Sequence, residues 1–352
     1  MRLVGGAALA AAMLVGAPPS RAQGGALTGT LVVVNRSDGT VSLVDLASKA
    51  ITATIPIGEG PHEVAVSPDG KLAAVSNYGS ARAPGATLSL VDIAEGTAHP
   101  IDLGGHRRPH GVAWTPDGGS VLVTTETDSA LLVVDPRAGA VTAVIRLAQS
   151  APDLLALSAD GARAYVTALG ASSVTVVDLA AKKVVASATL PKNADGVAVR
   201  PGSDEVWVTS PASERITVLG AADLAERATI PAPGYPMRLR FTPDGATALA
   251  LLGKASQLAF IDGASRKQSA TTPMRVSKAA MRGVKFAEGY ENATAPLGIA
   301  LSPDGAWAFV TMGAVDAVGI VSVPKRDMQA VVFVGREPDG VGYTPLVRAP
   351  SE

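Results

Sequence analysis

The sequence has no cysteine among its 352 residues, which excludes disulfide bonds, thiolate catalysis and cysteine-ligated metal sites. Charged residues are scarce at 17% of the chain, and 30 basic residues nearly balance 31 acidic ones. This balance excludes a general attraction to nucleic acid or to acidic lipid. Aromatic residues reach only 4%, and they do not alternate with basic residues as they do on surfaces that bind nucleic acids.

The short motifs of common catalytic and binding sites are also missing. The sequence contains no GxSxG nucleophile elbow, no GxxxxGK[ST] phosphate loop, no HExxH zinc motif and no EF-hand loop. It has only four histidines. Function therefore has to be inferred from how the fold arranges the residues, rather than from a motif.

One apolar run, from Leu3 to Val15, follows Arg2 and is too short for a membrane span with stable flanks. Ser20 and Ala22 are small residues at the two positions that a signal peptidase reads. We therefore expect a signal peptide over residues 1–22 and a mature chain that is soluble and periplasmic or secreted. A retained anchoring helix is the alternative. Without this segment, 28 basic and 31 acidic residues remain, a formal charge of −3.

Turn residues are abundant, with 37 glycines and 25 prolines, and apolar residues make up 47% of the chain. The turn signal SPDG recurs, complete or degraded, at spacings of 48, 43, 42, 42, 60 and 42 residues. Its copies begin at Ser67, Thr115, Ser158, Arg200, Thr242, Ser302 and Thr344. A repeat of about 42 residues with two insertions explains all of these spacings.

Each repeat has the same order of elements: an apolar strand before the turn, a second strand after it, a third that usually ends in aspartate, and a fourth. Four antiparallel strands in a unit of this length are typical of a propeller blade. The sequence therefore predicts an all-β, seven-bladed β-propeller over residues 28–346, after a short lead at 23–27 and before a tail at 347–352. The final strand, GVGYT at 340–344, is expected to complete the blade that begins with LVVVN at 31–35.

The repeats resemble the YVTN-type repeat of exported propellers, in units such as PHEVAVSPDGKLAAVSN from residue 61 and ADGVAVRPGSDEVWVTS from residue 194. The fold that this resemblance implies is also similar to the propellers of nitrous oxide reductase and of lactonases. The resemblance implies no activity, because the repeated residues are turn and core positions. Only His62 and His110 fit the histidine-rich channel of nitrous oxide reductase, and no lactonase acid or base set is matched.

Most of the repeated polar residues are expected to be structural. The aspartate of each SPDG-type turn and the aspartate that ends the third strand should accept hydrogen bonds from turn amides. The first group is Asp69, Asp117, Asp160, Asp244 and Asp304, and the second is Asp45, Asp92, Asp135, Asp178 and Asp262. Three tryptophans lie within predicted strands and should fill the space between blades: Trp114, Trp207 and Trp307.

One repeat position has the strongest functional signal. The residue five places before each turn is polar in five of the seven repeats, and in six it follows a proline that fixes how the chain enters the inner strand. Equivalent loops of a propeller surround one end of its central channel, so we expect these residues to form a ring at the channel mouth. In ring order they are Asp339, His62, His110, Asp153, Asp195, Met237 and Leu297.

Three interpretations of this ring stay open. Polar side chains at a wet channel mouth can simply hold water, or they can bind a small molecule or a protein partner. A divalent cation such as Zn²⁺ is the third, provided that the ligand atoms converge to about 2.0–2.2 Å from it. The candidate metal ligands are His62, His110, Asp153 and Asp339. The sequence assigns no cofactor beyond this candidate metal.

Two insertions enlarge the same face of the predicted propeller, a longer one at 276–294 and a smaller one at 77–86. The longer insertion and the segment 104–110 bring basic residues to the rim of the mouth: Arg107, Arg108, Arg275, Lys278, Arg282 and Lys285. The longer insertion is either a lid or partner-docking loop, or an ordinary surface excursion, since loops tolerate insertion.

We therefore expect an exported, monomeric propeller that acts as a binding or interaction module for a small ligand or an exported protein partner. The alternative is a metal-assisted hydrolase similar to lactonases, or an accessory protein of a periplasmic redox system. Binding is favoured over catalysis because the sequence contains no complete catalytic set.

Overall fold

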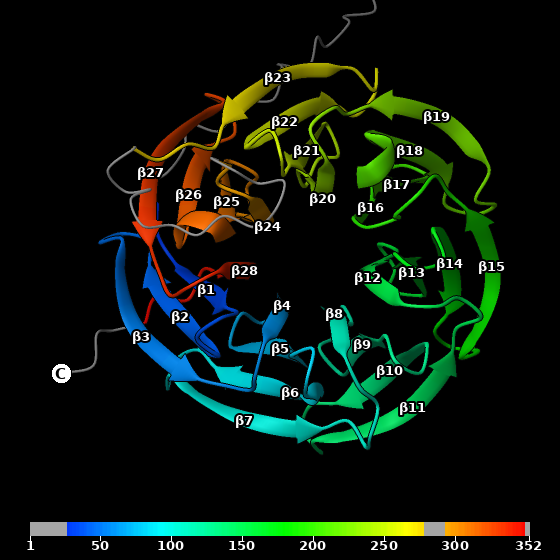
Figure 1. Ribbon diagram of the computed structural model, residues 1–352, viewed down its shortest axis with the longest axis horizontal. Coiled ribbons are helices and arrows are strands. Elements are labelled where there is room, and N and C mark those ends of the chain that lie inside the picture. Colours follow the sequence, from blue (N-terminus) through cyan, green and yellow to red (C-terminus); the bar gives the residue numbers. More distant parts are fainter. Residues whose placement is uncertain (1–26, 278–292, 349–352) are drawn as a thin grey trace, which may run out of the picture.

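The computed structural model describes residues 27–277 and 293–348. Within these residues the strands form seven four-stranded antiparallel sheets, arranged as blades around a central axis (Figure 1). This confirms the predicted all-β, seven-bladed propeller. The predicted signal peptide and most of the 276–294 insertion lie outside the described residues. The described helices are short 3₁₀ turns, η1 (Pro211–Ser213) and η2 (Gly313–Val315), and none is long enough to cross a membrane.

Each blade runs from an inner strand beside the axis to an outer edge strand. One blade joins β28 (Pro338–Thr344) to β1 (Thr30–Asn35), β2 (Thr40–Asp45) and β3 (Ala50–Pro56). The next two are β4 (Pro61–Val66), β5 (Leu72–Gly79), β6 (Pro84–Asp92) and β7 (Thr97–Asp102), and β8 (Pro109–Trp114), β9 (Val121–Thr125), β10 (Ala130–Asp135) and β11 (Ala140–Arg146).

The remaining four blades follow in chain order. They are β12 (Pro152–Leu157), β13 (Arg163–Ala168), β14 (Ser173–Asp178) and β15 (Lys183–Thr189); then β16 (Val197–Val199), β17 (Glu205–Ser210), β18 (Arg215–Gly220) and β19 (Glu226–Pro231). The last two are β20 (Pro236–Phe241), β21 (Thr247–Leu252), β22 (Gln257–Asp262) and β23 (Gln268–Pro273), and β24 (Pro296–Leu301), β25 (Trp307–Met312), β26 (Ala317–Ser322) and β27 (Asp327–Phe333).

The two ends of the described chain meet in one blade. The red strand β28 lies beside the blue strand β1 in Figure 1, and the two pair antiparallel with Thr30 opposite Thr344. A bulge between Val33 and Asn35 shifts their register once. The predicted closure is confirmed, and it turns a row of blades into a ring in which β28 contacts both β24 and β4.

The repeated aspartates have the structural role expected of them. Ser67 Oγ donates to Asp69 Oδ1 over 2.6 Å, and the backbone N–H of Lys71 donates to the same oxygen. At the end of β2, the N–H of Ser48 donates to Asp45 Oδ2 over 2.8 Å. Equivalent bonds recur in the other blades that have these aspartates. The SPDG-type turns therefore close hairpins at the end of the inner strands that is farthest from the ring residues.

Apolar side chains between neighbouring blades form the core. Trp207 is fully buried, and its ring meets that of Phe241 from the next blade edge-on, with 4.9 Å between the ring centres. Trp114 is buried as well, and its indole N–H donates to the carbonyl of Ala65 in the preceding blade. Trp307 is half-buried against the apolar cluster between the last blade and the closing blade. The predicted packing of the tryptophans between blades is confirmed.

A hydroxyl group on the second strand of several blades connects one inner strand to the next. Thr124 Oγ1 accepts the N–H of Gly111 over 2.8 Å and donates to the carbonyl of Asp153, in the next blade, over 2.6 Å. Three other hydroxyls donate across blades at 2.6–2.7 Å, from Ser76 to His110, from Thr167 to Asp195 and from Thr311 to Asp339. All of the accepting carbonyls belong to ring residues, so these hydroxyl bridges fix the backbone of the channel mouth.

Replacing Thr124 by valine is expected to destabilise the protein. The change leaves a buried carbonyl and a buried N–H without their partner, which lowers the free energy of unfolding by about 1–3 kcal/mol. Thr142→Val is the matched control, because the exposed Thr142 hydroxyl donates to Val133 O on the outer face of the same blade. Chemical denaturation measures both losses of unfolding free energy. Equal losses would show that the buried hydroxyl bridge contributes no more to stability than the exposed hydroxyl.

Candidate functional site

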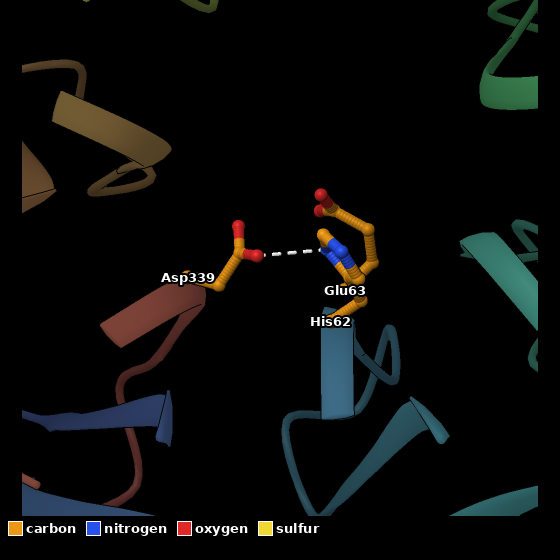
Figure 2. Close-up of side chains that lie close together, drawn as sticks. All are labelled: His62, Glu63 and Asp339. Atoms are coloured by element: carbon orange, nitrogen blue, oxygen red, sulfur yellow. Dashed lines mark ion pairs between the residues drawn. The ribbon is translucent and has the colours of Figure 1, made fainter. Parts of the chain in front are cut away.

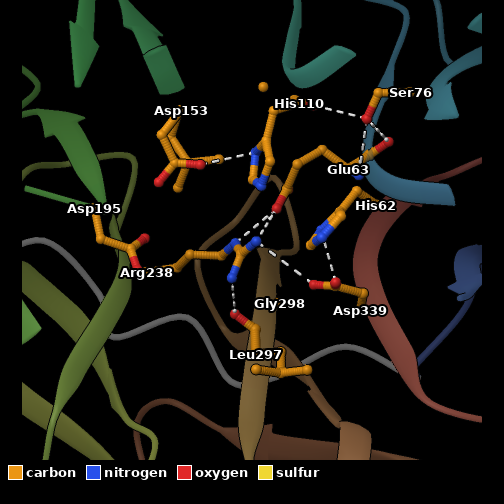
Figure 3. A network of polar contacts seen from close by, with 12 residues as sticks. His62, Glu63, Ser76, His110, Asp153, Asp195, Arg238, Leu297, Gly298 and Asp339 are labelled. Carbon is orange, nitrogen blue, oxygen red and sulfur yellow. Dashed lines mark hydrogen bonds and ion pairs between the residues drawn. The ribbon is translucent and has the colours of Figure 1, made fainter. Parts of the chain in front are cut away.

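The seven ring residues lie at the channel mouth, in the order that the repeat indicates. Six of them are the second residue of an inner strand, directly after a proline: His62, His110, Asp153, Met237, Leu297 and Asp339. Asp195 lies two residues before β16. The structure pairs His62 with Asp339 and His110 with Asp153, and Asp195 lies beside this group (Figure 3). Met237 and Leu297 occupy the two remaining ring positions.

Each ring histidine is paired with an aspartate from a neighbouring blade. His62 Nδ1 lies 2.7 Å from Asp339 Oδ2 (Figure 2), and His110 Nδ1 lies 2.9 Å from Asp153 Oδ1. The two imidazole rings face each other with 4.4 Å between their centres and 35° between their planes. Asp339, His62, His110 and Asp153 thus form a row across four successive blades. Because each Nδ1 faces a carboxylate, Nε2 is the ring nitrogen that could contact a ligand or a metal ion.

Tyr78 closes one side of this row. Its ring meets His62 and His110 edge-on, with centres 5.2 and 5.5 Å away. The Tyr78 hydroxyl donates to the carboxylate of Glu126, and the guanidinium of Arg108 lies over the ring at 4.9 Å. Tyr78 belongs to the smaller insertion noticed in the sequence, but nothing in the repeat marked it as a site residue. It fixes the two imidazoles by contact with their edges.

A second unexpected feature is an ion pair that crosses the channel. Arg238 of β20 and Glu63 of β4 are 175 positions apart, yet Arg238 Nε donates to Glu63 Oε1 over 2.8 Å and Nη2 contacts the same oxygen (Figure 3). Arg238 Nη2 also lies 3.5 Å from Asp339 Oδ1, and Nη1 donates to the carbonyl of Leu297 over 3.2 Å. One buried guanidinium therefore connects four blades.

The sequence did contain a signal for this pair. Glu63 and Arg238 directly follow ring residues, at a repeat position that is glycine in four blades: Gly111, Gly196, Gly298 and Gly340. Glycine is favoured there because the next blade is close; a Cβ on Gly298 would lie 2.2 Å from the carbonyl oxygen of Asp339. The structure places both charged side chains inward, toward the axis, where they meet (Figure 3).

Arg238 also replaces a hydroxyl bridge that its own blade lacks. In its blade, Leu251 stands at the second-strand position where Thr124 and Thr311 form hydroxyl bridges, as the strand registers show. The carbonyl that such a hydroxyl would reach belongs to Leu297, and Arg238 Nη1 donates to it instead. The guanidinium therefore both holds a backbone carbonyl of the ring and balances the charges of Glu63 and Asp339.

Burial and charge together set the protonation of the mouth. Burial alone would lower the pKa of His110, but the carboxylates of Asp153 and Glu63 outweigh it and raise the pKa to about 9. Burial acts in the opposite direction on Asp153 and Asp339, yet their histidine partners and Arg238 hold both pKa values below the usual range. His110, Asp153 and Asp339 are therefore charged at neutral pH.

Asp195 is the exception among the acids of the mouth. It is only 8% exposed, and among the described residues its carboxyl has no hydrogen bond or ion pair. Burial, followed by the negative charge of Asp153, raises its pKa to about 7, although Arg238 and His110 oppose this shift. Asp195 is thus a buried carboxyl that changes charge near neutral pH.

A pocket of about 300 Å³ opens beside the row of histidines and aspartates. Its polar walls come from Tyr78, His110, Glu126, Asp153 and Asn193, and its other walls from Ala151, Pro152, Leu169 and Gly170. Polar groups that converge on a concave, partly apolar surface are typical of small-molecule sites. This pocket is the concave part of the mouth into which His110 and Asp153 face.

A metal ion has one candidate position among the described residues. Ligand atoms of His62, Glu63 and Asp339 lie within 4.8 Å of one another (Figure 2). Two of these residues belong to the set that the sequence suggested, whereas His110 and Asp153 lie outside this grouping and Glu63 is new. Glu63 and Asp339 already face the guanidinium of Arg238, so a divalent cation would have to compete with an internal positive charge.

The basic rim expected from the sequence is only partly described. Arg108 stacks on Tyr78, and Arg107 Nη1 donates to the carbonyl of Pro84 over 3.5 Å. Arg275 is exposed where the longer insertion begins. Lys278, Arg282 and Lys285 lie outside the described residues, so the lid or docking role of this segment stays a prediction.

The ion pair across the channel is expected to contribute strongly to stability. Arg238→Met leaves the buried Glu63 carboxylate and the Leu297 carbonyl without their donor, which lowers the free energy of unfolding by about 3–5 kcal/mol. Combining it with Glu63→Gln should cost less than the sum of the single changes, because the pair is lost once. A double-mutant cycle by chemical denaturation measures this coupling.

The control for that cycle is the exposed ion pair between Arg227 and Asp204, whose atoms lie 2.6 Å apart. Arg227→Met with Asp204→Asn should show a much smaller coupling, because solvent screens surface pairs. Additive losses at Arg238 and Glu63 would contradict the role given to the cross-channel pair.

No protein-family model matches the chain, and no curated protein matches it. Solved structures do match. Hydrazine synthase of Kuenenia stuttgartiensis has a TM-score of 0.66 and 18% identity, with 88% of this chain and 99% of that chain covered. A functionally unknown protein from Desulfotomaculum acetoxidans has a TM-score of 0.73 and 12% identity, with 90% of this chain and 99% of that chain covered. Dihydro-heme d1 dehydrogenase NirN in complex with DHE has a TM-score of 0.64 and 17% identity, with 92% of this chain and 77% of that chain covered. Likeness at these identities shows the propeller fold alone.

Proposed function

We propose that this chain is an exported propeller of the YVTN type that binds a small polar molecule at its channel mouth. The observation that carries the proposal is the pocket beside the ring, where His110 and Asp153 meet Tyr78, Glu126 and Asn193 in about 300 Å³. Buried titratable groups with displaced pKa values, gathered at one concave surface, are a recognised mark of functional sites.

The pocket offers complementary chemistry on its different walls. His110, with a pKa of about 9, is protonated at neutral pH and can donate from Nε2. Asp153, Glu126 and Asn193 offer acceptor oxygens, and Leu169 gives an apolar wall that is 41% exposed. Tyr78 holds the imidazole in place, and its hydroxyl holds Glu126. Such a surface suits a ligand with both polar and apolar parts.

The setting of this binding is part of the proposal. The leader-like segment 1–22 supports export, and the solved structures that match include a hydrazine synthase and a protein titled as a dehydrogenase in complex with DHE. These titles describe those proteins only. They suggest, as part of the proposal, that this binding propeller is an accessory protein of an extracytoplasmic redox system.

Ligand binding is expected to depend on His110 and Asp153. In a thermal-shift screen of small polar metabolites, a compound that raises the melting temperature of the wild type should do so in His99→Ala but not in His110→Ala or Asp153→Asn. His99 is a suitable control because it is an exposed histidine on the outer strand β7. The proposal fails if no compound shifts the wild type, or if every compound that does so shifts all four proteins equally.

A cation site is the second candidate, and one observation favours it. Ligand atoms of His62, Glu63 and Asp339 lie within 4.8 Å of one another, so they could contact one ion. His62, with Glu63 and Asp339, would then bind the ion, and a hydrolase that activates water is the corresponding activity.

Elemental analysis separates the two candidates. Protein purified without chelator should contain close to one metal ion per chain if the second candidate is right, and His62→Ala should remove it. His99→Ala is again the control. Metal-free protein whose melting temperature does not respond to added Zn²⁺ would rule out this site.

A further inference from the structure

One acid at the mouth has no paired cation among the described residues. Asp339 has His62 and Arg238 as partners, Asp153 has His110, and Glu63 has Arg238. Asp195 is the remaining acid, and among the described residues no cation is paired with it. The next ring position, where a pairing partner like those of the other aspartates would stand, is Met237, whose thioether has no charge. The unmatched carboxyl lies at the boundary between the polar and the apolar parts of the ring.

We propose that Asp195 is the carboxylate that anchors the positively charged nitrogen of a small organic cation, an ammonium or guanidinium compound, bound at the channel mouth. This inference rests on the proposed function, because it names the class of ligand for the same mouth. The ligand's nitrogen takes the place of the missing partner of Asp195, and its apolar part lies along the apolar wall of the neighbouring pocket.

The position of Asp195 allows this contact. Its carboxyl lies between Asp153 and the side chain of Arg238 in Figure 3, and 8% of the residue remains open to solvent. Asn193, two positions earlier, and Asp153 both line the pocket. Leu169 and Pro152 provide the apolar wall of this pocket.

The charges that face Asp195 come from four other blades. Asp153 and Glu63 favour a cation, whereas His110 and Arg238 oppose it. These four groups form two ion pairs, His110 with Asp153 and Arg238 with Glu63, so each pair largely cancels its own field. Asp195 is then the uncompensated charge, and its attraction for a cation is enhanced because little water surrounds it.

Protons compete with such a cation. Since the pKa of Asp195 is raised to about 7, the carboxyl is mostly ionised above this pH and mostly protonated below it. The cation binds the ionised form, so its affinity should fall by about tenfold for each pH unit below 7. A ligand that is neutral or negative would show no such loss.

Three probes of matched size test the inference: n-butylammonium, n-butanol and butyrate, titrated by calorimetry at about pH 8.5 and about pH 5.5. We expect n-butylammonium to bind best, more tightly at the higher pH, and to lose this preference in Asp195→Asn but not in Asp327→Asn. Asp327 is an exposed aspartate on the outer strand β27. Absence of n-butylammonium binding, or binding that Asp195→Asn leaves unchanged, overturns the inference.

The same titrations distinguish this failure from failure of the proposed function. If n-butanol or butyrate binds, and His110→Ala abolishes that binding while Asp195→Asn does not, the mouth is a ligand site but Asp195 is not its cation anchor. If n-butylammonium binding survives both His110→Ala and Asp195→Asn, it occurs away from the mouth, which contradicts both.

The stability of Asp195→Asn provides an independent readout without any ligand. A carboxyl whose folded pKa lies above the unfolded value stabilises the fold at low pH and loses this contribution as the pH rises through about 7. The asparagine variant lacks the charge, so its melting temperature should exceed that of the wild type at about pH 8.5 and differ little at about pH 4. A lower melting temperature at the higher pH would mean that Asp195 has a partner in the free protein, against the inference.

Discussion

The constraint on which this structure depends is the spacing between neighbouring inner strands at the channel mouth. Hydroxyl bridges such as that of Thr124 hold it, because one oxygen accepts an N–H of its own blade and donates to a ring carbonyl of the next. Close approach of the blades also favours glycine at this repeat position, as at Gly298 and Gly340. Where Leu251 interrupts this pattern, the guanidinium of Arg238 supports the carbonyl instead. The backbone scaffold and the charged mouth are therefore built from one set of contacts.

Charges can be buried in this mouth because almost every one has a partner on another blade. An isolated buried ion is strongly unfavourable, whereas a well-hydrogen-bonded pair is tolerated. His62 with Asp339 and His110 with Asp153 are ion pairs between adjacent blades, and Arg238 with Glu63 is a hydrogen-bonded ion pair across the channel. Asp195 departs from the rule, and functional sites are where such departures are expected. The free energy needed to keep one carboxyl unpaired has to come from the rest of the ring.

Much of the architecture could be predicted from sequence, and the reason is repetition. The SPDG-type turns gave the blade number, the closure by β28, the role of aspartates such as Asp69, and the equivalence of the seven ring positions. What repetition does not show is how far a side chain reaches. Arg238 and Glu63 are separated by half of the chain and meet only because the ring is closed, and Tyr78 comes from an insertion that has no equivalent in other blades. Pairings between histidines and aspartates likewise depend on side-chain directions that an alignment of repeats leaves open.

The strand that closes the ring, β28, is also the last strand of the propeller to be synthesised. Asp339, which holds His62 and faces Arg238, lies on the last strand of the propeller, while its blade begins with β1. During synthesis, the residues of the N-terminal blades are made before this carboxylate. The mouth therefore cannot be complete until β28 has joined β1, and a chain clipped before Pro338 lacks the carboxylate that pairs with His62. Competence to bind would report that the whole polypeptide is present and closed.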